Sequence, residues 1–214
     1  MGRQQEYLAL GDSMSIDDYT GVEGSGAANQ FARTLGEGWT LDDRTYDGCR
    51  MAGVPRDACG DLITLTIGGN DLLCNKAKYL RAGLDAFAAE HYELLQAIRK
   101  ANPHAVSIVG DVYAPAMPLS SQEQFGLAAA NAAIGQNCER VGAVLAPIYD
   151  AFRSHESEYL CWAIEPNFKG AAAIAKLFNS AMLQSPIQTD KPLHQPWSGA
   201  NCFSNRRSLP EESF

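Results

Sequence analysis

The sequence predicts one three-layer α/β domain, in which helices cover both faces of a parallel sheet of about five strands. Three observations predict it. Short apolar runs of strand character alternate along the chain with longer runs of helical spacing. The strand-like runs are apolar throughout, as is typical of strands buried on both faces. The chain has 214 residues, 46% hydrophobic and 20% charged, which suffices for one well-buried core.

The strands are expected where these apolar runs end in glycine turns. Residues 7–10 form a short run that stops at Gly11, and residues 62–67 form the clearest strand before the turn Gly68-Gly69-Asn70-Asp71. Residues 106–109 and 143–146 supply two more, and another strand is expected directly before Tyr46-Asp47-Gly48.

Helical spacing of apolar residues predicts four helices between and after these strands. They cover residues 27–35, 84–100, 122–141 and 170–183. From residue 185 the composition shifts to Pro, Ser, Asn and Gln. The chain therefore divides into a domain of residues 1–184 and a polar tail of residues 185–214, which is either a strap across the domain or disordered.

The net charge of −8 argues against a nucleic-acid partner or an anionic membrane surface, because both need basic patches. No segment is long enough to span a membrane, and the N-terminus has no leader pattern. Six cysteines without a CxxC pair suggest neither a zinc site nor a redox motif, so free thiols in the cytoplasm are expected. A secreted form with its leader removed is the alternative. Nothing in the sequence indicates the oligomeric state.

Two of the glycine turns belong at one edge of the sheet. In an open parallel sheet, reactive groups gather beyond the carboxyl ends of the strands. The segment Gly11-Asp12-Ser13 follows the first strand, and Gly68-Gly69-Asn70-Asp71 follows a later one. Ser13 could simply cap a helix, and Asn70-Asp71 could be an ordinary turn. Their shared placement favours a functional site instead.

With Tyr46-Asp47-Gly48 between them, these segments resemble, in order, the first three motif blocks of the SGNH/GDSL hydrolases. The resemblance spans roughly residues 6 to 183. It implies the SGNH-hydrolase fold, with a flavodoxin-like parallel sheet. It also implies a serine hydrolase that cleaves a small carboxylic ester, as an esterase, lipase-like enzyme or deacetylase, and that needs no cofactor or metal.

The resemblance gives Ser13 the role of nucleophile in acyl transfer. It attacks the ester carbonyl, and the developing oxyanion needs donors already aimed at it. By resemblance, these donors are the backbone N–H groups of Ser13 and Gly48 and the side-chain amide of Asn70. Gly53 competes with Gly48 for this role, and Gly48 is favoured because its Asp-Gly turn directly follows the expected strand.

The last motif block departs from the family. Its usual pattern is Asp-x-x-His followed by Pro-Asn and a glycine that opens the final helix. Here the segment reads Trp162-Ala-Ile-Glu165-Pro166-Asn167-Phe-Lys-Gly170. Glu165 therefore occupies the position of the catalytic histidine, and Trp162 that of the aspartate that orients it.

Three explanations are open. Glu165 is itself the base, which needs burial to raise its pKa toward the working pH. Alternatively, a histidine from elsewhere in the chain is the base. His155 is the nearest candidate, and His194 in the tail is another. In the third, hydrolysis is lost, and the chain is a catalytically silent ligand-binding protein of SGNH fold.

Asp12, Asp17 and Asp18 form an acidic cluster around the nucleophile, which raises the different hypothesis of a hard-cation site. No histidine or further acidic motif with ligand spacing accompanies them. Asp12 is instead expected to orient the turn, and Asp17 and Asp18 to begin or cap the next segment.

Overall fold

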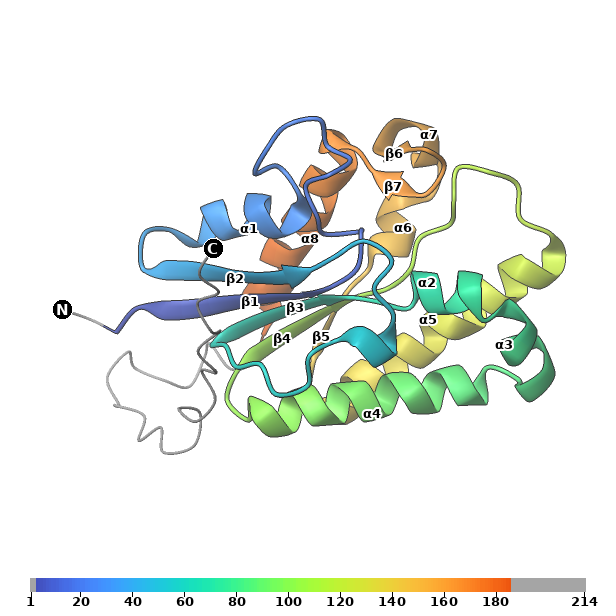
Figure 1. Ribbon diagram of the computed structural model, residues 1–214, viewed down its shortest axis with the longest axis horizontal. Helices are drawn as coiled ribbons and strands as arrows, with labels where there is room; N and C mark the ends of the chain where they lie inside the picture. The colour runs from blue at the N-terminus through green and yellow to red at the C-terminus, as the bar shows by residue number, and fades with distance from the viewer. Residues whose placement is uncertain (1–2, 186–214) are drawn as a thin grey trace, which may run out of the picture.

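The computed structural model describes residues 3–185, and Figure 1 shows its layers. The central sheet has the order β2-β1-β3-β4-β5, and every neighbouring pair is parallel. Its strands are β1 (Gln5–Gly11), β2 (Trp39–Thr45), β3 (Leu62–Thr66), β4 (Val106–Gly110) and β5 (Val144–Ala146). This is a flavodoxin-like strand order, and the predicted parallel sheet of about five strands is confirmed.

Helices cover both faces of the sheet (Figure 1). On one face α1 (Ala27–Leu35) packs against α8 (Phe168–Gln184), and on the other α4 (Asp85–Ala101) packs against α5 (Ser121–Val141). The three-layer α/β/α architecture is therefore confirmed. It places the carboxyl ends of all five strands at one edge, which we call the catalytic edge.

Two hydrophobic cores lie between the sheet and its helices, one on each face. Strand β1 contributes side chains to both, because successive residues of a strand point to opposite faces. Tyr7 is buried against Phe31 of α1, with ring centroids 5.2 Å apart. Leu8 faces the other way, into the cluster that contains Leu94 of α4. A fully buried side chain such as that of Leu8 stabilises the fold by roughly 1.5–3 kcal/mol.

Short elements occupy the connections around the sheet. They are η1 (Met51–Gly53), α2 (Gly69–Cys74), α3 (Lys76–Ala82), α6 (Ile148–Phe152), α7 (Glu156–Tyr159), and the antiparallel pair β6 (Leu160–Cys161) and β7 (Glu165–Pro166). None of them was predicted from the sequence, because these segments of two to seven residues are shorter than the window over which hydrophobic periodicity identifies a helix.

Most predicted ends lie within one residue of the observed ones, and three differences are larger. Strand β1 begins at Gln5, two residues before the predicted run. The segment Gly68-Gly69-Asn70-Asp71 is not only a turn, since helix α2 begins at Gly69. The final helix begins two residues earlier than predicted, because the side chain of Asn167 accepts the N–H groups of Lys169 and Gly170 and caps it. Residues 186–214, which include most of the predicted tail and His194, lie outside the described residues.

Within residues 3–185 no helix is both long and apolar enough to cross a bilayer. Cys49, Cys74, Cys138 and Cys161 are free thiols, as expected. The same expectation is wrong for Cys59, which is disulfide-bonded. Compartment chemistry alone gives no information about which cysteines the fold brings within bonding distance.

Candidate active site

Ser13 lies in the turn directly after β1, at the catalytic edge. Gly11 ends the strand with φ of 124°, and a Cβ there would stand 1.9 Å from the carbonyl oxygen of Thr66 in β3. Only glycine permits this approach. The N–H of Asp12 donates to the same carbonyl oxygen at 2.9 Å. Strands β1 and β3 are thus held together at the point where the chain turns toward Ser13.

The Asp12 side chain is buried beneath this turn and shapes it. Its Oδ1 accepts the N–H of Met14 at 3.2 Å. Burial raises the pKa of Asp12 to about 8; hydrogen bonds from Met14 and Thr66 oppose the rise, and the charges of Glu165 and Asp71 add to it. Asp12 therefore orients the turn, as the sequence predicts.

Gly48 lies in the turn that follows β2, one strand away from Ser13. Its φ of 70° is left-handed, and the preceding Tyr46 donates its N–H to the carbonyl oxygen of Gly11 at 3.1 Å. The turn is therefore tied to the end of β1. Within the described chain, the N–H groups of Ser13 and Gly48 donate no hydrogen bond, so both are free to meet an oxyanion.

Asn70 lies in the first turn of α2, beyond the carboxyl end of β3. Its Nδ2 donates to the carbonyl oxygen of Cys49 at 3.1 Å, which places the amide against the Gly48 turn. The same nitrogen carries a second N–H. The structure therefore brings the three predicted oxyanion donors to one edge of the sheet.

Gly53, the competing donor, is differently placed. It ends η1, and its N–H is already bonded to the carbonyl oxygen of Arg50 at 2.8 Å. A Cβ at this position would stand 2.1 Å from the hydroxyl of Tyr46. Tyr46 is partly exposed and its hydroxyl can move, so this contact does not by itself require glycine. The bonded N–H of Gly53 is what favours Gly48 as the donor.

Glu165 opens β7 and is 7% exposed. Burial raises the pKa of its carboxyl and the charge of Asp47 adds to the rise, while hydrogen bonding by the Ser13 side chain lowers it. Its Oε2 is buried without a hydrogen-bond partner among the described residues. A carboxyl group beside the nucleophile, with a raised pKa and an oxygen to spare, has the properties of a general base.

Trp162 does not orient Glu165, although it occupies the position of the orienting aspartate. Its side chain is 84% exposed and lies against Tyr19 instead. The backbone around Glu165 is held by other groups. The Tyr113 hydroxyl donates to the carbonyl oxygen of Ile164 at 2.6 Å. Cys161 Sγ lies 3.4 Å from the backbone carbonyl oxygen of Glu165.

Comparison with known proteins shows the family of this chain. The model of the GDSL-like Lipase/Acylhydrolase family matches residues 9–173. The chain belongs to this family. It is a GDSL-type hydrolase, an enzyme of the ester-cleaving class that the sequence predicts. A search of curated proteins finds no match.

Several solved structures share the GDSL hydrolase fold. A lipase from a goat rumen metagenome has a TM-score of 0.71 and 21% identity, over 83% of this chain and 97% of that one. An acetyl xylan esterase from Geobacillus stearothermophilus has a TM-score of 0.66 and 15% identity, over 85% and 96%. A member of the lipolytic G-D-S-L family from Veillonella parvula has a TM-score of 0.66 and 14% identity, over 84% and 98%.

The histidines of this GDSL hydrolase make no described contact with Ser13. His155 precedes α7, and its ring is half exposed, 3.5 Å from Glu158 and stacked on Tyr159. His91 is fully buried in α4 against Phe87, and burial lowers its pKa to about 4. It is a neutral packing residue. The described contacts therefore favour Glu165 over His155 as the base.

The acidic cluster gives no metal site in the described part of the chain, where no group of three or more His, Cys, Asp or Glu could hold an ion. The Asp17 carboxylate is occupied by the Gly-rich loop. It accepts the N–H of Gly24 at 2.6 Å, that of Gly26, and the amide of Asn29 at 3.1 Å. Asp17 therefore braces the segment before α1.

Sequence reasoning missed two residues of the site. Asp71 is buried and accepts the N–H of Met51 at 3.1 Å, which joins α2 to the segment after β2. Tyr19 lies beside Trp162 and near Glu165. Asp71 ends the motif Gly68-Gly69-Asn70-Asp71, so its place in that motif could have identified it as a site residue. Tyr19 follows no pattern that could have identified it.

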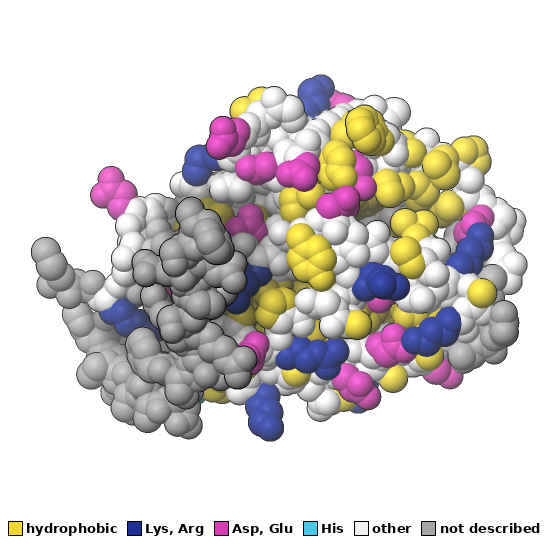
Figure 2. Space-filling model, in the orientation of Figure 1, with side chains coloured by type: hydrophobic (Ala, Val, Ile, Leu, Met, Phe, Trp, Pro, Cys, Tyr) yellow, Lys and Arg dark blue, Asp and Glu magenta, His cyan; other side chains and the backbone are white. Residues whose placement is uncertain are grey.

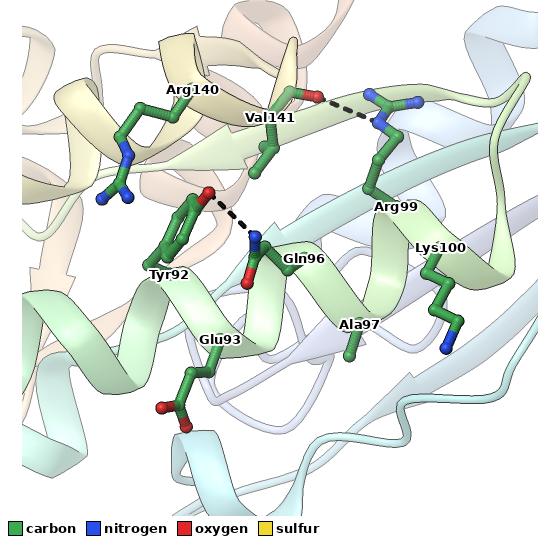
Figure 3. Close-up of a pocket in the computed structure, with 8 residues that line it drawn as sticks. All are labelled: Tyr92, Glu93, Gln96, Ala97, Arg99, Lys100, Arg140 and Val141. Carbon is green, nitrogen blue, oxygen red and sulfur yellow. Dashed lines mark hydrogen bonds between the residues drawn. The ribbon is translucent and has the colours of Figure 1, made fainter.

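A pocket of about 620 Å³ lies between α4 and α5, away from Ser13. Figure 3 shows Arg140 over the ring of Tyr92, at 3.5 Å from its centroid, and Gln96 donating to the Tyr92 hydroxyl at 2.8 Å. Its residues come from the C-terminal halves of the two helices, which lie toward the opposite edge of the sheet (Figure 1). No serine or cysteine lines it, so it is not the site of acyl transfer.

Proposed function

We propose that this GDSL hydrolase cleaves carboxylic esters through an acyl-enzyme on Ser13, with Glu165 as general base. The observation that carries the proposal is the pairing of Ser13 with a buried carboxyl whose second oxygen lacks a partner among the described residues. Gly48 and Asn70, with the N–H of Ser13, support it as oxyanion donors.

In the acylation step, Glu165 takes the hydroxyl proton as Ser13 Oγ bonds to the ester carbon. The carbonyl electrons move to the oxygen, which the three donors stabilise. The tetrahedral intermediate then expels the alcohol, which receives the proton from Glu165. Water repeats the sequence on the acyl-enzyme, with Glu165 again as base, and releases the acid.

The burial of Glu165 suits it to this role. An exposed glutamate has a pKa near 4.3 and is a weak base at neutral pH. Burial raises the pKa of Glu165 and brings it closer to the working pH. The shift increases its affinity for the Ser13 proton.

The first test replaces the nucleophile. We expect Ser13→Ala to lose roughly 10⁴-fold or more in kcat on p-nitrophenyl acetate, because it removes the atom that forms the acyl-enzyme. Fluorophosphonate should label the parent protein but not the variant. Ser180→Ala, an exposed position on α8, is the matched control and should keep full activity. Equal turnover by Ser13→Ala and the parent would favour a ligand-binding role for the SGNH fold.

The second test identifies the base. We expect kcat/KM to fall as pH drops through the raised pKa of Glu165, because only the carboxylate accepts the proton. Glu165→Gln should abolish this acid limb together with most of the activity. His155→Ala should leave both in place. Full activity of Glu165→Gln would remove Glu165 from the mechanism, and loss in His155→Ala would transfer the role to His155.

A further inference from the structure

The turn between β6 and β7 presents an aromatic side chain to solvent beside Glu165. Trp162 is 84% exposed. Its backbone φ is 51°, and that of the following Ala163 is 71°. Left-handed backbone is strained for residues that carry a Cβ, and consecutive strained residues concentrate at functional sites.

The tryptophan side chain does not hold this turn in place. The carbonyl oxygen of Ala163 accepts the N–H of Ala116 at 2.7 Å, and that of Ile164 accepts the Tyr113 hydroxyl. These contacts fix the backbone from the segment after β4. A mostly exposed indole adds little to this anchoring, so stability does not account for tryptophan at position 162.

Trp162 and Tyr19 form an aromatic pair. The two ring centroids are 6.1 Å apart, and the rings are tilted by 60°. Tyr19 also lies within electrostatic range of Glu165, Asp47 and Asp18, whose negative charges act on its hydroxyl. The pair therefore lies next to the proposed base, with carboxylates around it.

We propose that Trp162 and Tyr19 form a subsite that stacks against a sugar ring of the substrate, so that the ester cleaved is an acylated saccharide. The inference rests on the proposed function of Ser13. It concerns the part of the substrate beyond the scissile bond, which Ser13, Gly48 and Asn70 do not contact.

The surroundings of the pair favour a sugar over an alkyl chain. One face of a sugar ring presents C–H groups that can cover an exposed indole, while its hydroxyls can donate to carboxylates such as Asp47 and Asp18. An alkyl chain laid over the same acids would strip their water without replacing it. Figure 2 shows acidic and hydrophobic side chains next to each other along the upper edge of the molecule. The net charge of −8 also disfavours anionic ligands.

The test first measures binding without turnover. In the Ser13→Ala background, binding of methyl β-D-glucopyranoside is measured by isothermal titration calorimetry, which does not depend on the indole as a reporter. We expect saturable binding, lost in Trp162→Gly and largely kept in Trp162→Phe, which retains a ring. Glycine accepts the left-handed backbone, so Trp162→Gly should fold as the parent does. Phe125→Ala, which removes another exposed aromatic from α5, is the matched control and should bind the glucoside as the parent does.

Kinetics then connect the subsite to catalysis. We expect Trp162→Gly to lose about tenfold in kcat/KM on an acetylated methyl glucoside relative to hexyl acetate, mainly through KM. An equal or larger loss on hexyl acetate would assign the pair to an alkyl chain and overturn the proposal. So would the absence of saturable glucoside binding in the protein that keeps Trp162. Failure of the proposed function is separate, since it would appear as Ser13-independent turnover.

Discussion

At the residue scale, the site gathers three buried carboxyl groups, Asp12, Asp71 and Glu165, around one serine. Burial raises the pKa of each, and the charges of Glu165 and Asp71 add to the rise at Asp12. Carboxyl groups that share a water-poor space disfavour one another's ionisation. With a pKa of about 8, Asp12 holds a proton at neutral pH that an unfolded chain would release.

The raised pKa of Asp12 predicts whether the stability of the fold rises or falls with pH. Its pKa is about 8 in the folded chain, against roughly 3.9 when unfolded. The folded state therefore binds the proton more tightly, and this contribution to stability is full below pH 3.9 and lost as pH rises through 8. We expect the Tm of Asp12→Asn to fall less between pH 5 and pH 8 than that of the parent. Thermal unfolding followed by circular dichroism measures both, and parallel curves would contradict the pKa assigned to Asp12.

At the scale of elements, helix α2 is joined to the segment after β2 by two hydrogen bonds. The Asp71 carboxylate accepts the N–H of Met51, and the Asn70 amide donates to the carbonyl oxygen of Cys49. Cys49 and Met51, the residues that make these bonds, follow Gly48 closely in the chain and flank Arg50. The helix therefore fixes the positions of Gly48 and Asn70, two of the three proposed oxyanion donors.

Replacing Asp71 tests this connection. We expect Asp71→Leu to lower kcat roughly 10- to 100-fold with little change in KM, because displaced donors weaken transition-state stabilisation more than substrate binding. Asp71→Asn keeps an acceptor oxygen and should recover most of the loss. Both are assayed well below the Tm of each variant. A loss of stability with unchanged kcat would reduce Asp71 to a purely structural role.

The sequence predicted the long elements and missed the short ones, for a physical reason. Helices such as α4 and α5 repeat their apolar spacing over several turns, so their pattern is legible. The β6–β7 pair has two residues in each strand, and it forms through contacts with Tyr113 and Ala116 from a distant segment. Ser13, Gly48, Asn70 and Glu165 were identified from motifs. Tyr19 was not, because tertiary structure alone brings it to the site.

At the scale of the whole molecule, the chain has a net charge of −8 and places its proposed nucleophile among buried and exposed acids. Such a field repels anionic substrates over a distance of about one Debye length, roughly 10 Å at 0.1 M salt. The two edges of the sheet also differ, since the proposed active site occupies one and the Arg140–Tyr92 pocket lies toward the other.

This charge predicts a salt dependence. We expect kcat/KM for monoethyl succinate, an anionic ester, to rise several-fold between about 10 and 150 mM NaCl, since salt screens the repulsion. The value for ethyl butyrate, which is neutral, should change little and serves as the control. The same response for both esters would show that the field of the protein does not select among substrates.

The close approach of Gly11 to Thr66 determines where this enzyme can be re-engineered. A library that randomises position 11 would consist almost entirely of inactive chains, because any side chain there would collide with the β3 backbone. Position 162 is exposed and already carries a large side chain, so a substitution there meets no such collision, and its left-handed backbone only favours residues such as glycine and asparagine. Directed evolution toward new esters should therefore keep β1 unchanged up to the nucleophile and diversify the β6–β7 turn.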